Sequence, residues 1–65
     1  MNMGKALRVA QMLNETTNKK LSTELGIPTQ MIHRWRYMKD MKISRAKQIA
    51  DYFNMSLDEL VRLGK

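Results

Sequence analysis

Apolar residues recur along the chain at intervals of three and four positions, the spacing of helices that each bury one face. The first stripe predicts a helix from Met3 to Leu13. Its apolar positions are Met3, Leu7, Ala10 and Leu13. Because the chain has only 65 residues, we expect one all-α domain, residues 1–65, made of five short helices around one core.

A pair of short helices is expected on either side of Gly26. The first begins at Asn18 or Lys19, and Thr17 or Asn18 can cap it. Gly26 follows directly after its last residue, where a helix end favours a residue that can adopt a positive φ. Pro28 suits the first turn of the next helix, because its missing N–H would be unpaired there in any case.

The helix expected from about Pro28 to Met38 has two chemically different faces, if each residue advances by 100°. The apolar face consists of Met31, Ile32, Trp35 and Met38. The opposite face carries hydrogen-bonding groups of several kinds and consists of Thr29, Gln30, His33, Arg34 and Tyr37. The apolar face therefore predicts that Trp35 belongs to the core, and the polar face is free to contact a partner.

Two further helices are predicted after a basic connection. Ser44 is placed to cap the fourth helix, whose apolar stripe is Ile43, Ala46, Ile49, Ala50 and Phe53. The fifth helix opens on a capping box formed by Ser56 and Glu59, with Met55 and Leu60 as its hydrophobic staple. This helix should end by Gly64. Three of its apolar residues either form a dimer surface or simply complete the core: Leu57, Val61 and Leu63.

The charge of the chain narrows the range of partners. Twelve Lys and Arg against six Asp and Glu give a net charge of +6, and the excess is concentrated between residues 34 and 47. A one-sided positive field favours nucleic acid or an anionic membrane surface, although charge alone also fits a solvated basic face. The absence of cysteine excludes disulfides and thiolate metal sites, and fits a soluble protein of the cytoplasm.

Residues 18–36 have the spacing of a helix-turn-helix. Such a motif needs a small residue where its helices cross, here Ser22, and a glycine four positions later at the turn, here Gly26. The apolar residues that can lock the two helices together are Leu21, Leu25, Ile27, Ile32 and Trp35. This geometry leaves the outer face of the second helix free to enter the major groove of DNA.

Two segments carry a resemblance to a known family. In LSTELGIPTQMIHRWR (21–36) and RAKQIADYFNMSLDEL (45–60), the chain resembles the phage Cro/repressor-type, or xenobiotic-response-element-like, helix-turn-helix family. The likeness extends over about residues 7–63 and implies a lambda-repressor-like DNA-binding domain. It further implies a transcriptional repressor that binds a pseudo-palindromic double-stranded operator as a homodimer, in the nucleoid of a bacterial host cell.

The chain departs from the family's pattern in three places. The family often has glutamine where this chain has Asn18, and usually has alanine where it has Ser22. A serine is accommodated there if its hydroxyl bonds the backbone four residues back. The loop after the recognition helix usually contains glycine, whereas residues 37–42 contain none.

Four residues are the candidates for reading bases. The amide of Gln30 matches the N7 and N6 edge of adenine, and Arg34 can pair with guanine O6 and N7 or grip a phosphate instead. Thr29 either touches a thymine methyl or a phosphate, or caps the helix. His33 is expected to contact DNA rather than the core, and its protonation beside a phosphate would strengthen binding at lower pH.

The candidate phosphate contacts flank this helix on both sides. They are Asn18, Lys19, Lys20, Arg36, Tyr37, Lys39 and Lys42. The N-terminus of the helix before the turn adds free N–H groups and the positive end of a helix dipole. Contacts of this kind position a protein on DNA without reading its sequence.

Other function classes are less well supported by the residues. The single histidine has no partner for catalysis, and no metal-ligand cluster or glycine-rich phosphate loop is present, so we expect no enzyme, cofactor, metal or small-molecule ligand. The main alternative is an antitoxin-like or protein-interaction module with the same fold. Nonspecific binding to RNA or to a membrane surface is a third interpretation, but the pattern predicts neither aromatic residues on a sheet nor a basic amphipathic helix.

Overall fold

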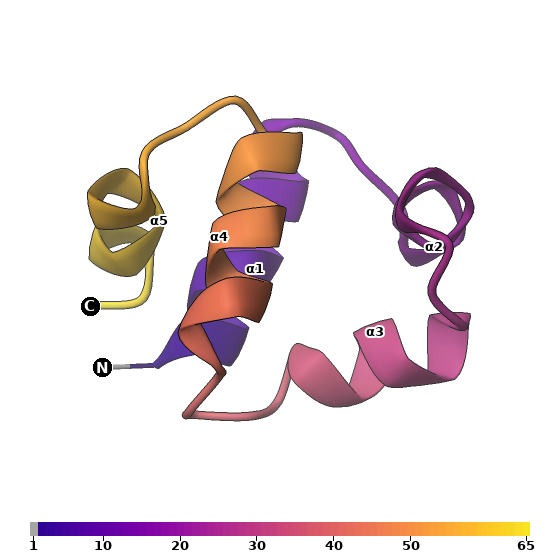
Figure 1. The fold of residues 1–65 in the computed structure, drawn as a ribbon, viewed down its shortest axis with the longest axis horizontal. Helices are drawn as coiled ribbons and strands as arrows, with labels where there is room; N and C mark the ends of the chain where they lie inside the picture. The colour runs from indigo at the N-terminus through magenta and orange to yellow at the C-terminus, as the bar shows by residue number, and fades with distance from the viewer. Residues whose placement is uncertain (1) are drawn as a thin grey trace.

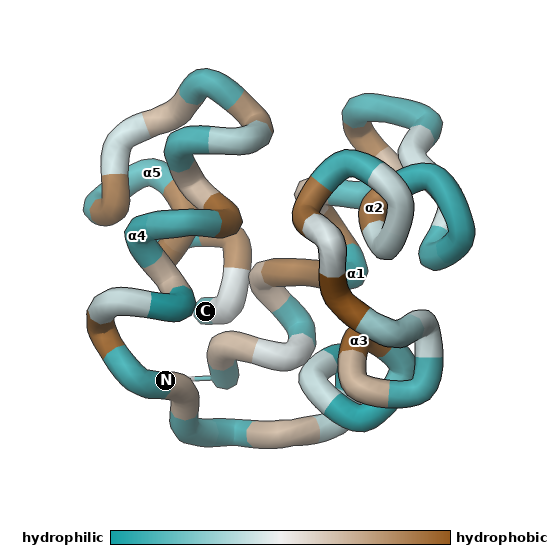
Figure 2. The backbone as a smooth tube through the Cα atoms, turned by 45° about the vertical axis from the view of Figure 1, so that its right-hand side comes forward, coloured by the Kyte–Doolittle hydropathy of each residue, from teal (hydrophilic) through white to brown (hydrophobic). Residues whose placement is uncertain are grey.

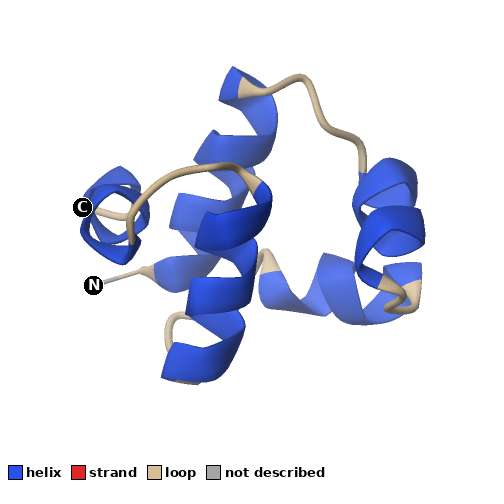
Figure 3. Cartoon of the chain, turned by 45° about the horizontal axis from the view of Figure 1, so that its top comes forward, coloured by secondary structure: helices blue, strands red, loops and turns tan. Residues whose placement is uncertain are grey.

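The computed structural model describes residues 2–65, and Met1, the first residue of the predicted domain, lies outside them. Within these residues the chain forms five helices and no strand, as Figures 1 and 3 show, which confirms the predicted all-α class. The helices are α1 (Met3–Leu13), α2 (Asn18–Leu25), α3 (Thr29–Trp35), α4 (Ile43–Tyr52) and α5 (Leu57–Leu63).

The helices form two groups around one core. In Figure 1, α5 lies on one side of α1 and α4, and the α2–α3 pair lies on the other side. The helix α1 joins the groups, because it packs on both α5 and α3. In Figure 2, hydrophobic and hydrophilic positions alternate along the backbone of the helices. The buried apolar residues are Met3, Ala6, Leu7, Ala10, Leu21, Ile32, Trp35, Ala46, Ile49, Ala50, Phe53 and Leu60.

The predicted helix ends are largely confirmed. The Thr17 hydroxyl accepts from the N–H of Lys20 at 3.1 Å and so caps α2. At the start of α5, Ser56 and Glu59 form the expected capping box, in which each side chain accepts from the other's N–H. Hydrogen bonds from Ser56 stabilise the ionised carboxylate of Glu59 and lower its pKa below the ordinary value of 4.5. The backbone N–H of Ser56 has the larger effect and its hydroxyl the smaller one.

Some predicted core positions are wrong. Leu13 is 63% exposed because the last turn of α1 extends past the helices that cover its earlier turns. Ile43 is 73% exposed, because it is the first residue of α4 and points away from the core. Met31 and Met38 are also exposed. Ser44 is not the N-cap of α4, because the helix already begins at Ile43. Lys42 occupies the N-cap position and makes no side-chain cap bond.

The helix α3 ends at Trp35, three residues before the predicted end. The N–H of Met38 instead donates to the carbonyl of Trp35, at 3.2 Å, and the chain leaves the helix. The first turn of α1 then holds the loop: the N–H of Met3 donates to Lys39 O at 2.9 Å, and the N–H of Gly4 donates to Met38 O at 2.7 Å. The path of this loop is therefore fixed from outside the loop.

The small residue that this loop requires lies in α1. A Cβ atom on Gly4 would stand 2.6 Å from the carbonyl oxygens of both Arg36 and Met38. The loop has no glycine of its own, and the close approach of the two backbones is made possible by Gly4 instead.

None of the helices in residues 2–65 is long and apolar enough to cross a bilayer.

Candidate nucleic-acid interface

The outer face of α3 carries the four predicted base readers. Their side chains are all exposed: Thr29, Gln30, His33 and Arg34. On the opposite side Ile32 and Trp35 are buried, so the rotation of the helix about its axis is set by the core. Pro28 occupies the N-cap position without a side-chain cap bond, which excludes the capping role considered for Thr29.

The turn between α2 and α3 fixes the angle at which α3 is presented. Gly26 ends α2 in the left-handed conformation, with φ +67°. The Ser22 hydroxyl donates to the carbonyl of Ile27, and the N–H of Ile27 donates to the carbonyl of Ser22 at 3.1 Å. The serine is accommodated in a different way from the backbone bond four residues back that was considered for it, because its hydroxyl bonds forward to the turn.

A stacking contact joins α3 to α4. The guanidinium carbon of Arg45 lies 4.2 Å from the centroid of the Trp35 ring, within the range of a cation–π interaction. Trp35 is 6% exposed, which confirms the prediction that it belongs to the core rather than to a stacking platform for bases. Arg45 therefore stacks over the Trp35 ring and connects α4 to α3.

The N-terminus of α2 offers backbone donors beside this face. The first N–H groups of a helix have no partner inside the helix. Thr17 accepts from Lys20 through its hydroxyl and from Leu21 through its carbonyl, which leaves the N–H groups of Asn18 and Lys19 facing outward. The side chains of Lys19 and Lys20 are exposed at the same helix end.

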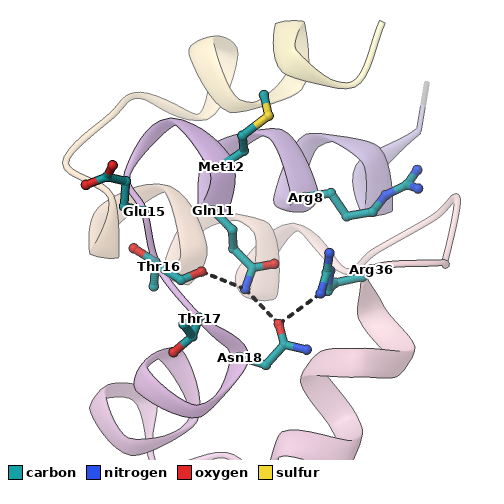
Figure 4. A pocket seen from close by; sticks show the side chains of 8 residues that line it. All are labelled: Arg8, Gln11, Met12, Glu15, Thr16, Thr17, Asn18 and Arg36. Atoms are coloured by element: carbon teal, nitrogen blue, oxygen red, sulfur yellow. Dashed lines mark hydrogen bonds between the residues drawn. The ribbon is translucent and has the colours of Figure 1, made fainter.

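A hollow beside this helix end brings two predicted phosphate contacts together. Figure 4 shows Asn18 and Arg36 at its rim, with an Arg36 Nη1–Asn18 Oδ1 distance of 3.3 Å. Gln11 reaches the same oxygen from α1, at 2.8 Å. Arg8 also lines the hollow, so two arginines border it.

The remaining candidates are more scattered. Tyr37 is exposed, and its ring lies 5.4 Å from the Arg8 guanidinium and 5.4 Å from the His33 ring. Lys42 lies next to α4, where it borders a second hollow with Trp35. Lys39 borders a different hollow, near the two ends of the chain, and is not brought together with Asn18.

Sequence reasoning missed Gln11 and Arg8. Gln11 follows Leu7 by four positions and therefore falls on the buried stripe of α1, which is the signal that could have identified it. A polar side chain at a buried helix position requires hydrogen-bonding partners: the Gln11 Nε2 has two, and the buried Oε1 has none among the described residues. Arg8 gave no such signal, because its neighbour Tyr37 is distant in the sequence.

The charge and donor chemistry of this surface suit a polyanion and give no sign of catalysis. Residues 29–38 contain no acidic side chain, and the described part of the chain holds no group of three His, Asp or Glu residues that could bind a metal. What the fold presents is an exposed polar helix, flanked by backbone and cationic donors, on a helix-turn-helix. These are the parts of a DNA-binding domain.

Comparison with known families agrees with this class. Residues 6–64 match the model of the Cro/C1-type HTH DNA-binding domain. The chain belongs to this family of DNA-binding, non-enzymatic regulators, which confirms the resemblance seen in the sequence and the expectation that it is not an enzyme. No curated protein and no solved structure matches the chain.

Proposed function

We propose that this protein is a sequence-specific transcriptional repressor of the phage Cro type, which binds a pseudo-palindromic operator and inserts α3 into the major groove. The observation that carries the proposal is the exposed polar face of α3 opposite the buried Ile32 and Trp35. A helix held in this way can bring side chains to base edges without moving its own backbone.

Each polar residue of α3 has a proposed role. Gln30 pairs with adenine and Arg34 with guanine, while Thr29 and His33 contact the neighbouring bases or phosphates. The proposed phosphate contacts are Asn18, Lys19, Lys20, Arg36, Tyr37, Lys39 and Lys42. The exposure of Lys19, Lys20 and Tyr37 supports their roles, and the proximity of Arg36 to the α2 N-terminus supports its role.

We also propose that the protein binds DNA as a homodimer through the start of α4 and the outer side of α5. An apolar hollow there is lined by Ile43, Leu57 and Val61, among others. Ile43 is 73% exposed, which is unfavourable for a large aliphatic side chain in water. A second copy related by two-fold symmetry would cover it with the same surface.

Residues 1–65 act in this proposal as one domain, in the nucleoid of a bacterial host cell. The family's DNA-binding role supports this location, since the operator lies on DNA there. The alternative role as an antitoxin-like or protein-interaction module uses the same fold with a protein as its main partner.

Selection of DNA from a random pool at physiological salt tests the proposal. We expect enrichment of a two-fold site whose half-sites are about 34 Å apart. Affinity that falls steeply with salt, with no enriched sequence, would leave only a polyanion binder. A failure to retain any duplex would favour the protein-interaction alternative.

A further inference from the structure

A chain of two side-chain amides connects α1 to the N-terminus of α2. Gln11 is only 5% exposed, although it is polar. Its Nε2 donates to the backbone carbonyl of Thr16 at 3.3 Å and to Oδ1 of Asn18 at 2.8 Å. Arg36 donates to the same Asn18 oxygen at 3.3 Å. Figure 4 shows all of these bonds meeting beside the hollow at the α2 N-terminus.

The backbone of Thr16 determines which way both amides point. A carbonyl oxygen can only accept, so the Gln11 amide must turn its nitrogen toward Thr16. The same nitrogen also donates to Asn18, so Asn18 must accept with its amide oxygen. Because a guanidinium can only donate, Arg36 requires the same orientation of Asn18 from the other side.

These bonds determine the orientation of the Asn18 NH₂ group. Its amide oxygen has two lone pairs, and both are engaged by the two donors. The Asn18 NH₂ group is therefore turned away from Gln11, as Figure 4 shows. Figure 4 shows this NH₂ group on the side that faces α3, so its two N–H donors are not used by Gln11 or Arg36.

We propose that Gln11 is a positioning residue for DNA binding: it holds the Asn18 amide with its N–H groups toward a backbone phosphate. This inference rests on the proposed phosphate contact of Asn18 and adds the buried group that orients it. Gln11 itself stays inside the protein and does not touch DNA. An Asn18 amide in the opposite orientation would present its oxygen to the phosphate and repel it.

A double-mutant cycle separates positioning from a general effect on the fold. We would measure the affinity of the whole chain for a mixed-sequence DNA duplex of about 20 base pairs, since phosphate contacts do not depend on sequence. Gln11→Met keeps the length of the side chain but cannot donate. It should weaken binding about ten-fold, as expected for a lost hydrogen bond to a charged group.

The same substitution is then made in the Asn18→Ala background, where there is no amide left to orient. There Gln11→Met should change affinity by no more than about two-fold. Gln11→Glu, which can only accept, should reverse the Asn18 amide and weaken binding at least as much as Gln11→Met. Met12→Glu, an exposed neighbour on α1, measures the effect of the added negative charge alone.

Thermal unfolding of each variant identifies any loss of fold. A ten-fold loss from Gln11→Met in both backgrounds would overturn the inference, because Gln11 would then act on the connection between α1 and α2 and not through Asn18. Unchanged affinity of the Gln11→Met variant would overturn it as well. If the wild-type chain bound no duplex at any salt concentration, the proposed function itself would fail, and the positioning role with it.

Discussion

Ser22 and Ile27 are hydrogen-bonded to each other twice, across the turn that joins α2 to α3. The N–H of Ile27 donates to the Ser22 carbonyl, and the Ser22 hydroxyl donates to the Ile27 carbonyl. The second bond satisfies a carbonyl that follows the end of a helix and would otherwise need water. The turn that aims the recognition helix is thus held by a side chain at the helix crossing as well as by its glycine.

Ser22→Ala should lower the free energy of unfolding by about 1 kcal/mol, although alanine is the better helix former. The loss arises because the Ile27 carbonyl is left without its side-chain donor. Chemical denaturation measures the change. Thr23→Ala is a matched control, since Thr23 donates to Lys19 O within the same helix and its loss should be close to neutral. Equal effects of both substitutions would contradict the special role of Ser22.

Gly4→Ala should destabilise the fold by about 1–3 kcal/mol. Alanine at an unobstructed helix position would instead gain about 1 kcal/mol over glycine, so the sign of the change is diagnostic. The physical reason is the 2.6 Å approach of a Cβ to two carbonyl oxygens of the loop after α3. Thermal unfolding checks it, with Met12→Ala on the exposed side of α1 as the neutral reference. A stabilised Gly4→Ala variant would show that the loop can move away at no cost.

Gln30→Ala and Lys20→Ala should weaken DNA binding in different ways. Loss of a base contact at Gln30 should cost about 1–3 kcal/mol on the selected operator and little on unrelated DNA. Loss of the Lys20 charge should weaken both DNAs alike and reduce the slope of log affinity against log salt by about 1. Fluorescence anisotropy titrations over a range of salt distinguish the two. A Gln30→Ala effect that is the same on every sequence would remove Gln30 from the base readers.

Ile43→Lys should prevent the proposed dimer while leaving the monomer folded, because this side chain is already 73% exposed. Binding to a two-fold operator should then fall to the level of a single half-site. Sedimentation of the protein–DNA complex gives the stoichiometry. Met12→Lys adds the same charge to another exposed apolar position and should leave two copies bound. Two bound copies of the Ile43→Lys variant would place the dimer surface elsewhere.

The capping box of α5 should make stability sensitive to acid. The pKa of Glu59 is lowered in the folded state. The ionised carboxylate therefore adds to the free energy of unfolding above about pH 4.5, and this stabilisation is lost as the pH falls through the folded-state pKa. Glu59→Gln can still accept from Ser56 but does not titrate. Between pH 5 and pH 2, the melting temperature of the wild type should therefore fall more than that of the variant. Parallel curves would show that the carboxylate adds nothing.

Much of the fold could be predicted because single residues carry strong local signals. Gly26 and the Ser56–Glu59 pair marked two helix boundaries correctly, since a positive φ and a capping box are properties of a few consecutive residues. The exposure of Ile43 and Leu13 could not be predicted in the same way. A periodic stripe gives the direction of a face, but the extent of the neighbouring helices decides where burial ends.

In the candidate site, too, some features could be predicted from the local sequence and others could not. The outward face of α3 follows from periodicity alone, and its four candidate readers are exposed as expected. Gly4 was missed because its importance depends on backbone carbonyls that lie far along the chain. Gln11 was missed although it lies on the buried stripe of α1 and its partners Thr16 and Asn18 are close in the sequence. The Gly4 contact with the loop after α3 joins residues more than thirty positions apart. No local pattern contains such a contact.

The loop after α3 is held through its carbonyl oxygens, so its backbone path does not depend on the type of its side chains. Met3 and Gly4 hold the backbone at Met38 and Lys39, and backbone atoms are the same for every residue type except proline. Side chains at positions 37–39 can therefore be exchanged without removing the bonds that shape the loop. The scaffold is suited to libraries randomised at these positions, in which new contacts at the end of the recognition helix are sampled on an unchanged backbone.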